Sequence, residues 1–499
     1  MPHFESVVNT LSLTYESAEL NSISVMKALD KMLKRTRGRS MKKLMVFVSI
    51  LFLFFSLAAC SSDKTSSSDK IEVWTQAAAD HPEGKMFADR VKSYNEAHPD
   101  GPKVEIQNIT RAGAGSGYID KLNAAITAND MPDIFTLDGP DIGAYVDSGL
   151  LGELDEYVSE GFKDGFTQAI IDQGTVDGKF YGMGYSDSGV AIMYNEDMIN
   201  ALPEDIKALV PSHDQDWTWD QFIELSRKVD EFAKTSNDPA FANYEVSVSL
   251  LLTDITAGAY ELGTYYFTPL LWGNDANIVD EDGVTVDGVL NNDKSVEALT
   301  KYAQLFAEPA LASATESEKT FHTGKSALSV SGFWYVNELI NNYPDLKFKT
   351  VRYPKMSEDF DGLYTPSGSW AFVRNGQEED EERIKQIVEV MEWLNNDEAS
   401  KEYFAKNGSI PTRINSLDAI DTNTDNPYHN DAWTVLKYQV ENTNKSRPVS
   451  PGYPYLSETF AKDVILKIAQ NKATDEATIK KYLDDAAKKI ELEFAKYKK

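Results

Sequence analysis

The order of strand and helix patterns after residue 69 limits the possible folds of this chain more than any other feature. Short stretches that are apolar or alternate between apolar and polar residues are typical of strands, and here they are separated along the chain by amphipathic helix patterns. Strand patterns lie at 70–74, 103–110 and 132–140, and helix patterns at 84–99, 118–130 and 142–158, the last one broken by Gly149. Strand–helix–strand order implies right-handed crossovers and a mainly parallel sheet, so the sequence predicts an α/β fold.

The rest of the chain continues this mixture of elements. Thr218 is placed to cap a helix, because its hydroxyl can accept from a free amide of the first turn. Helix patterns lie at 217–234, at 381–408 and from 459 towards the C-terminus, and a helix–turn–strand–helix pattern lies at 321–340. No internal repeat is visible in the sequence. These blocks predict two α/β lobes.

A hydrophobic stretch before Cys60 has the parts of an export signal. Lys42 and Lys43 precede an apolar run at 44–57, and the run leads into the quartet LAAC. As a helix, these 14 residues would rise only ~21 Å, which is short of the ~30 Å hydrocarbon core of a bilayer. A permanent membrane span is therefore not expected here.

The quartet LAAC resembles the bacterial lipobox, whose cysteine receives a diacylglycerol group and becomes the new N-terminus. This resemblance predicts a lipoprotein signal peptide at 41–59, a lipidated Cys60, and a serine-rich tether at 60–69. Cys60 is the only cysteine, which excludes an internal disulfide and zinc sites with several thiolates. A buried hydrophobic cysteine is the alternative. Residues 1–40 are either a cytoplasmic extension or a start assigned too far upstream; we favour the second, which N-terminal mass spectrometry of the precursor would decide.

The charge of the chain restricts its partners. The formal net charge is -30, and residues 1–59 carry eight Lys/Arg and four Asp/Glu, so the part from Cys60 onwards stands at -34. Such a surface repels nucleic acids and anionic lipids, and it disfavours a strongly anionic ligand. The sequence contains no G-x-S-x-G, H-E-x-x-H or Walker A motif. We therefore expect no enzyme activity, no catalytic residues, no cofactor and no metal ligands.

Six segments, in order, resemble the family 1 extracellular solute-binding proteins of ABC importers, the group of maltose-binding-protein-like receptors. One of them, FHTGKSALSVSGFWYVNEL, is similar to the family pattern F-x-x-G-K-x-A-x-x-x-x-G-x-W. The segments lie at 131–157, 178–199, 217–222, 321–339, 366–376 and 407–417. Each segment alone is a weak signal, but their order after a lipobox is a specific one, and the resemblance covers about 70–499.

The resemblance implies a two-lobed, periplasmic-binding-protein-like fold of type II, with a hinge and a ligand cleft between the lobes. The predicted lobe 1 comprises 70–184 and 355–411, and the predicted lobe 2 comprises 189–350 and 412–499. The hinge would lie near Tyr185–Ser188 and Val351–Pro354. A ligand that touches both lobes binds the closed state preferentially and shifts the population towards it.

Candidate ligand-binding residues follow from the chemistry of a sugar, which has a faintly apolar face and a rim of hydroxyls. Aromatic rings suit the face, and carboxylates and amides suit the hydroxyls, especially at strand ends and in lobe-crossing loops. The candidates are Gln76, Asp138, Asp187, Trp272, Asn274, Trp334, Gly368, Ser369, Trp370 and Tyr453. By the resemblance, Trp334 matches the family's sugar-stacking tryptophan and Asp187 a cleft carboxylate at the lobe crossing.

Each candidate also has a structural alternative. Trp334 could be a core residue, Asp187 a solvated turn residue and Asp138 a helix cap. Trp74 and Arg111 are weaker candidates, since strand packing and a solvated charge explain them as well.

The sequence thus predicts a lipid-anchored receptor at the extracellular face of the cytoplasmic membrane of a bacterium, with a Gram-positive one favoured. It would capture a saccharide, with an oligosaccharide favoured, and deliver it as a monomer to an ABC permease. Two alternatives stay open. The same receptor could take a glycerol phosphodiester, a polyamine or a peptide, or the protein could be a surface-anchored polysaccharide hydrolase.

Overall fold

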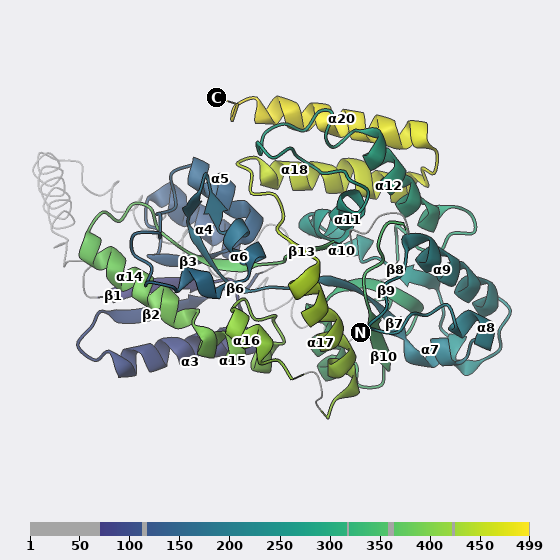
Figure 1. Ribbon diagram of the computed structural model, residues 1–499, viewed down its shortest axis with the longest axis horizontal. Helices are drawn as coiled ribbons and strands as arrows, with labels where there is room; N and C mark the ends of the chain where they lie inside the picture. The colour runs from purple at the N-terminus through teal and green to yellow at the C-terminus, as the bar shows by residue number, and fades with distance from the viewer. Residues whose placement is uncertain (1–69, 112–116, 317–318, 358–363, 422–424, 499) are drawn as a thin grey trace, which may run out of the picture. The chain divides into compact units, whose positions relative to one another are not determined.

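The computed structural model describes residues 70–111, 117–316, 319–357, 364–421 and 425–498 (Figure 1). The predicted segments 1–40, 41–59 and 60–69, with Cys60, lie outside these residues. No helix in the described ranges combines the length and the apolar character needed to cross a bilayer.

The first sheet contains the three strands predicted from the sequence and two later ones. Its order is β2 (Lys103–Asn108), β1 (Lys70–Thr75), β3 (Ile134–Asp138), β12 (Trp370–Arg374) and β6 (Gly182–Ser186). β1 pairs in parallel with β2 and β3, whereas β12 runs antiparallel to β3 and β6. The prediction of a mainly parallel α/β sheet is confirmed, with β12 as the one strand of opposite direction among these five.

Side chains of this sheet alternate between two apolar layers, as a strand period of two requires. Ile71 and Val73 pack in one layer with helices α3 and α14, while Trp74 and Leu137 pack in the other with α4. The helices are α3 (Pro82–Ala97), α14 (Glu381–Leu394) and α4 (Tyr118–Ala128), and α15 (Asp397–Asn407) packs beside α3 (Figure 1). The sheet therefore lies between two helical layers.

The helix predicted at 142–158 is much shorter than expected. α5 (Ile142–Asp147) ends two residues before Gly149, whose φ of 68° lies in the left-handed region that an α-helix cannot use. Beyond it, Leu151 forms a β-bridge with Asn375. Gly149 thus ends the helix and turns the chain back to the sheet.

The second sheet has four strands and a larger core. Its order is β10 (Phe348–Val351), β7 (Val190–Asn195), β9 (Ser326–Gly332) and β8 (Val246–Ser249). β7 is antiparallel to β10 and β9, and β8 is parallel to β9. Val190 and Ile192 face one core, and Ala191 and Met193 face the other. The first core also holds α9 (Trp219–Ala233), α11 (Glu261–Trp272), α12 (Asp293–Ala303), α18 (Tyr453–Phe460) and α20 (Glu476–Phe494).

A local signal in the sequence marks the start of α9. The predicted cap at Thr218 is confirmed as a reciprocal capping box, because Gln221 N donates to Thr218 Oγ1 at 3.2 Å and Thr218 N donates to Gln221 Oε1 at 2.7 Å.

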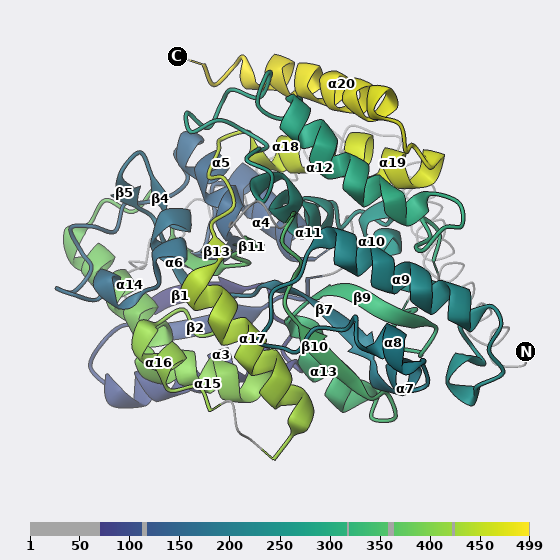
Figure 2. The ribbon, with the colours of Figure 1, turned by 45° about the vertical axis from the view of Figure 1, so that its right-hand side comes forward.

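On the other face of the second sheet, α17 (Pro427–Asn442) runs beside β10 and near β13 (Asn444–Lys445), as Figure 2 shows.

The described chain passes between the two sheets in three places. The first crossing joins β6 to β7, near the predicted Tyr185–Ser188. After the predicted second crossing at Val351–Pro354, the chain still contacts the second sheet. Lys355 bridges to Thr218, and Met356 is buried in the core of the second sheet. Tyr353 and Met356 are both buried in that core, and the chain enters the first sheet only after β11 (Thr365–Pro366).

The third crossing runs through the segment around the predicted boundary at 411, because Ile410 and Leu417 pack in a core of the second sheet while their neighbours keep contacts with the first sheet. Thr167 N donates to Thr412 O, and the guanidinium of Arg413 lies over the ring of Phe166 on the side of the first sheet. The chain joins the second sheet with α17, after α16 (Ile414–Asp418), which packs on α15. The described sheets are called the first and second lobe below.

Candidate functional site

The carboxyl ends of β1 and β3 bring together four of the predicted site residues. Gln76 follows β1 and donates from its backbone to Thr136 Oγ1 on β3, at 3.2 Å. Asp138 ends β3 and is paired in register with Trp370, the first residue of β12. Ser369, just before it, accepts from Gly139 N at 2.8 Å. In an open α/β sheet this edge is where ligands bind, because strand ends present their loops there.

Arg111 lies beside this edge. Its guanidinium carbon is 4.6 Å from the centre of the Trp370 ring, a cation–π contact, and its side chain is exposed. A cation and an aromatic ring thus border the same strand ends.

On the second lobe, Trp334 presents an open aromatic face. It begins α13 (Trp334–Asn342) directly after β9 and is 40% exposed, unusual for so large an apolar side chain. Its ring stacks on Tyr266 with a centroid distance of 6.3 Å and an interplanar angle of 15°. Gly332 makes room for the indole, since a Cβ there would lie 2.1 Å from a ring carbon. The indole is therefore held in place on one side and open on the other.

Three carboxyl groups near these strand ends were not predicted from the sequence: Glu83, Asp141 and Glu261. Tyr185 donates to Glu83 at 3.1 Å, and desolvation raises the pKa of Glu83 to about 7 against that hydrogen bond and the charge of Arg111. Desolvation also raises the pKa of Asp141 to about 8, and the charges of Asp138 and Glu261 add to the shift. Their positions just after the ends of β1 and β3 are a signal that sequence reasoning could have used for Glu83 and Asp141. Perturbed carboxyl groups of this kind gather at functional sites.

Arg447 links carboxylates of both lobes, and it too was missed. It donates to Asp138 at 2.5 Å and 3.3 Å, to Glu261 at 2.6 Å and to Ser367 O at 3.0 Å. Its side chain is only 2% exposed. Burial alone would lower the pKa of Arg447, but the charges of Asp138 and Glu261 raise it well above its usual value. Because Arg447 lies more than 300 residues from Asp138 in sequence, no local pattern could have joined them.

Asp187, predicted as a cleft carboxylate at the lobe crossing, is enclosed by hydrogen-bond donors. It is 3% exposed, and its two oxygens accept four hydrogen bonds, which leaves little capacity for a ligand. Burial raises the pKa of Asp187 to about 6, against the effect of these hydrogen bonds. Gly368 lies next to it, where a Cβ would come within 1.9 Å of Ser188 Oγ. Both residues therefore belong to the connection between the lobes.

Three further candidates are buried in structural contacts. Trp272 is 2% exposed and donates to Asn277 Oδ1 at 3.0 Å. Asn274 donates to Lys294 O at 2.8 Å and to the carboxylate of Glu297 at 3.0 Å. The predicted ligand contacts of Trp272 and Asn274 have no support in this arrangement, because burial leaves no free face.

Tyr453 and Trp74 are also buried in structural contacts. Tyr453 is 1% exposed and donates to Glu261 at 2.8 Å, so it supports the carboxylate that Arg447 binds. Trp74 is 8% exposed and packs in the core of the first lobe.

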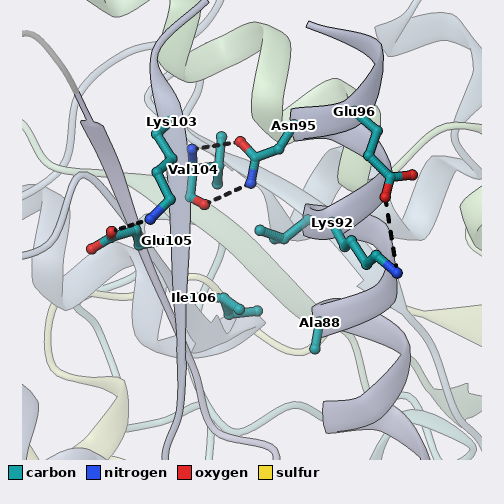
Figure 3. Close-up of a pocket in the computed structure, with 9 residues that line it drawn as sticks. Ala88, Lys92, Asn95, Glu96, Lys103, Val104, Glu105 and Ile106 are labelled. Atoms are coloured by element: carbon teal, nitrogen blue, oxygen red, sulfur yellow. Dashed lines mark hydrogen bonds and ion pairs between the residues drawn. The ribbon is translucent and has the colours of Figure 1, made fainter. Parts of the chain in front are cut away.

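A surface groove of about 580 Å³ lies between α3 and β2, but none of the predicted residues lines it (Figure 3). The Asn95 amide donates to Val104 O at 2.9 Å and accepts from Val104 N at 2.8 Å. It thereby occupies the outward main-chain groups of one residue of the edge strand β2, and native proteins protect such edges against strand addition. We therefore assign the groove to edge protection rather than ligand binding. Within the described ranges, no three or more His, Cys, Asp or Glu side chains are grouped to hold a metal ion.

Comparisons with known proteins agree with this arrangement. The galactooligosaccharide-binding protein of Bacillus subtilis strain 168 is 25% identical over 469 residues, which are 89% of this chain and 96% of that protein. The cyclic alpha-maltosyl-1,6-maltose binding protein from Arthrobacter globiformis has the same fold, with a TM-score of 0.67 and 19% identity, covering 85% of this chain and 98% of that one.

UgpB from Mycobacterium tuberculosis, solved in complex with glycerophosphocholine, also shares the fold, with a TM-score of 0.66 and 16% identity. The match covers 87% of this chain and all of that one. The family model for bacterial extracellular solute-binding proteins matches residues 89–432, more than half of the chain. With its two lobes and this coverage, the chain belongs to the bacterial extracellular solute-binding proteins.

Proposed function

We propose that this protein is the substrate-binding component of an ABC importer and captures an oligosaccharide between its two lobes. The observation that carries the proposal is the half-exposed indole of Trp334, stacked on Tyr266 and open on its other face. Such a ring suits the C–H face of a sugar. The similarity to a galactooligosaccharide-binding protein over most of both chains points to the same ligand class.

The polar groups support a ligand rich in hydroxyls. Glu83, Asp138, Asp141 and Glu261 offer acceptors, and Arg111 offers donors near Trp370. The raised pKa values leave Asp141 and part of Glu83 uncharged at neutral pH. Arg447 is already paired with Asp138 and Glu261, so of the two guanidinium groups only that of Arg111 is exposed for a phosphodiester. The likeness to UgpB keeps a glycerol phosphodiester as the second candidate.

A thermal-shift screen tests the ligand class. The panel should contain galacto-, malto- and chitooligosaccharides, glycerophosphocholine, spermidine and short peptides. We expect an oligosaccharide to raise the melting temperature, because a ligand at about 100 times its Kd stabilises the folded state by about 2.7 kcal/mol. A rise with glycerophosphocholine alone would replace the sugar by the phosphodiester. Chromatography of the same mixtures should show intact sugars, and products of cleavage would instead indicate a hydrolase.

The membrane anchor is a separate part of the proposal. Cys60 follows a stretch with the parts of an export signal and precedes a serine-rich stretch. A diacylglycerol group on its sulfur would hold the protein at the outer face of the membrane through two acyl chains, where it would meet its permease. We expect Cys60→Ser to move the protein from the membrane to the soluble fraction of cells. Retention of the variant in the membrane fraction would rule out anchoring through this sulfur.

A further inference from the structure

Three segments of the chain pass between the lobes, and they meet at one residue. The first crossing, Asp187–Gly189, joins β6 to β7, and the second, Ser367–Ser369, joins β11 to β12. The third begins at Ile410, after α15, and leads through α16 to α17. Asp187 makes hydrogen bonds to all three.

The side chain of Asp187 joins the first two crossings. Its Oδ1 accepts from Ser188 N at 2.7 Å, from Ser367 Oγ at 2.9 Å and from Gly368 N at 2.9 Å. Its Oδ2 accepts from Asn444 Nδ2 at 2.8 Å. Asn444 belongs to β13, which pairs with β11 directly before the second crossing. One carboxylate thus holds two crossings and the strand beside them.

The backbone of Asp187 joins the third crossing. Asp187 N donates to Ile410 O at 3.1 Å, and Ile410 N donates to Asp187 O at 3.2 Å. This exchange is an isolated antiparallel bridge outside both sheets. The three crossings therefore share one polar centre.

Close packing leaves the crossings no room to slide separately. Gly368 N lies 3.3 Å from Ser188 O, and a Cβ on Gly368 would come within 1.9 Å of Ser188 Oγ and 2.7 Å of Tyr265 Oη. The Ser188 hydroxyl also shares a hydrogen bond of 2.7 Å with Tyr265 on α11 of the second lobe. A change at one crossing must therefore move the others.

We propose that Asp187 is a positioning residue that joins the three crossings into one pivot and thereby sets the equilibrium between open and closed lobes. The proposal rests on the proposed function, capture of a ligand by lobe closure. Hinge motion is absorbed by a few residues at the ends of elements, and their coupling decides whether the lobes move as rigid bodies. With asparagine at 187, an NH2 donor replaces the Oδ2 that accepts from Asn444, and a neutral amide oxygen replaces the charged acceptor of Ser188 N, Ser367 Oγ and Gly368 N. The links between the crossings are then weaker, and the crossings can rearrange independently.

The test compares Asp187→Asn with a matched surface variant, Asp214→Asn. Asp214 is exposed and also accepts from a serine hydroxyl, that of Ser212. Both changes are made in the full chain carrying Cys60→Ser, with spin labels on cysteines at the exposed positions Glu381 on α14 and Glu224 on α9. The distance between the labels then reports the lobe arrangement with and without ligand.

We expect Asp187→Asn to broaden the distribution of label distances in the free protein and to weaken ligand binding roughly tenfold, while Asp214→Asn changes neither. The distance readout needs no ligand, so it stands even if the sugar proposal fails. An unchanged distribution in Asp187→Asn, with only a lower melting temperature, would make Asp187 a merely structural residue and overturn the inference.

Single-donor variants keep the test decisive if Asp187→Asn does not fold. Ser367→Ala and Asn444→Ala each remove one hydrogen bond and leave the carboxylate in place. Each should broaden the distance distribution less than Asp187→Asn would, and the double variant should broaden it more than either. Two single variants and a double variant that all match the parent protein would also refute the proposal.

Discussion

Arg447→Met is expected to lower the free energy of unfolding by about 3 kcal/mol, because it breaks a buried ion-pair network. The guanidinium is 2% exposed and neutralises Asp138, 13% exposed, and Glu261, 27% exposed. Its removal leaves two close carboxylates without a counter-charge and Ser367 O without its donor. The residual exposure of both carboxylates places the loss at the lower end of the range for buried ion pairs, and urea unfolding measures it.

A surface pair provides the control. Lys481 and Asp485 form an i,i+4 ion pair on α20 with side chains 70% and 53% exposed. Lys481→Met should cost at most about 1 kcal/mol, because water and salt screen such pairs. Adding Asp138→Asn to Arg447→Met should recover part of the loss, since it removes one of the uncompensated charges. A loss below about 1 kcal/mol for Arg447→Met would show that water, rather than Arg447, solvates these carboxylates.

Most of the first lobe could be predicted from local patterns. The strands at 70–75, 103–108 and 134–138 and the helix at 82–97 agree with the predicted positions to within two residues at most ends. These signals are local, because alternation and helical periodicity record which side of an element is buried. The place of β12 between β3 and β6 could not be seen in the same way, since its partners lie about 190 and 235 residues earlier.

The candidate site was predictable only in part, for the same reason. Asp138 was predicted from its place at the end of a strand and Trp370 from the family resemblance of its loop, and the structure pairs them across β3 and β12. Trp272 and Tyr453 belong to the same residue types, but tertiary packing buries them. A single sequence does not distinguish an exposed aromatic ring from a buried one, because both follow the same apolar periodicity.

Asp187 shows the limit most clearly. The family resemblance suggested a cleft carboxylate at the lobe crossing, whereas the carboxylate is enclosed by donors from segments 180 and 257 residues away. Residue type and local position indicated a functional place, the crossing between lobes. Ser367 and Asn444, which bond its carboxylate, are so far away in sequence that only the folded structure shows these contacts.

Trp334→Ala is expected to weaken oligosaccharide binding at least tenfold, which is about 1.4 kcal/mol, without unfolding either lobe. A stacked aromatic contact contributes about 0.5–1.5 kcal/mol beyond the area that it buries. Because 40% of the side chain is already exposed, its loss should leave a smaller cavity than loss of the buried Trp272, whose change to alanine should cost about 3–5 kcal/mol of stability. Titration calorimetry with the sugar found in the thermal-shift screen measures the affinity.

Two further variants test whether sugar binding depends on the open ring face of Trp334 or only on the amount of exposed apolar surface. Trp334→Phe keeps a flat ring at the start of α13 and should retain most of the affinity. Leu492→Ala removes an apolar side chain that is 81% exposed on α20, and it should change neither binding nor stability. If Trp334→Ala binds the sugar as tightly as the parent, the indole serves only to cover Tyr266. The carboxylates at the ends of β1 and β3, with Arg111 and Trp370, would then have to supply the affinity, and Glu83→Gln would become the informative change.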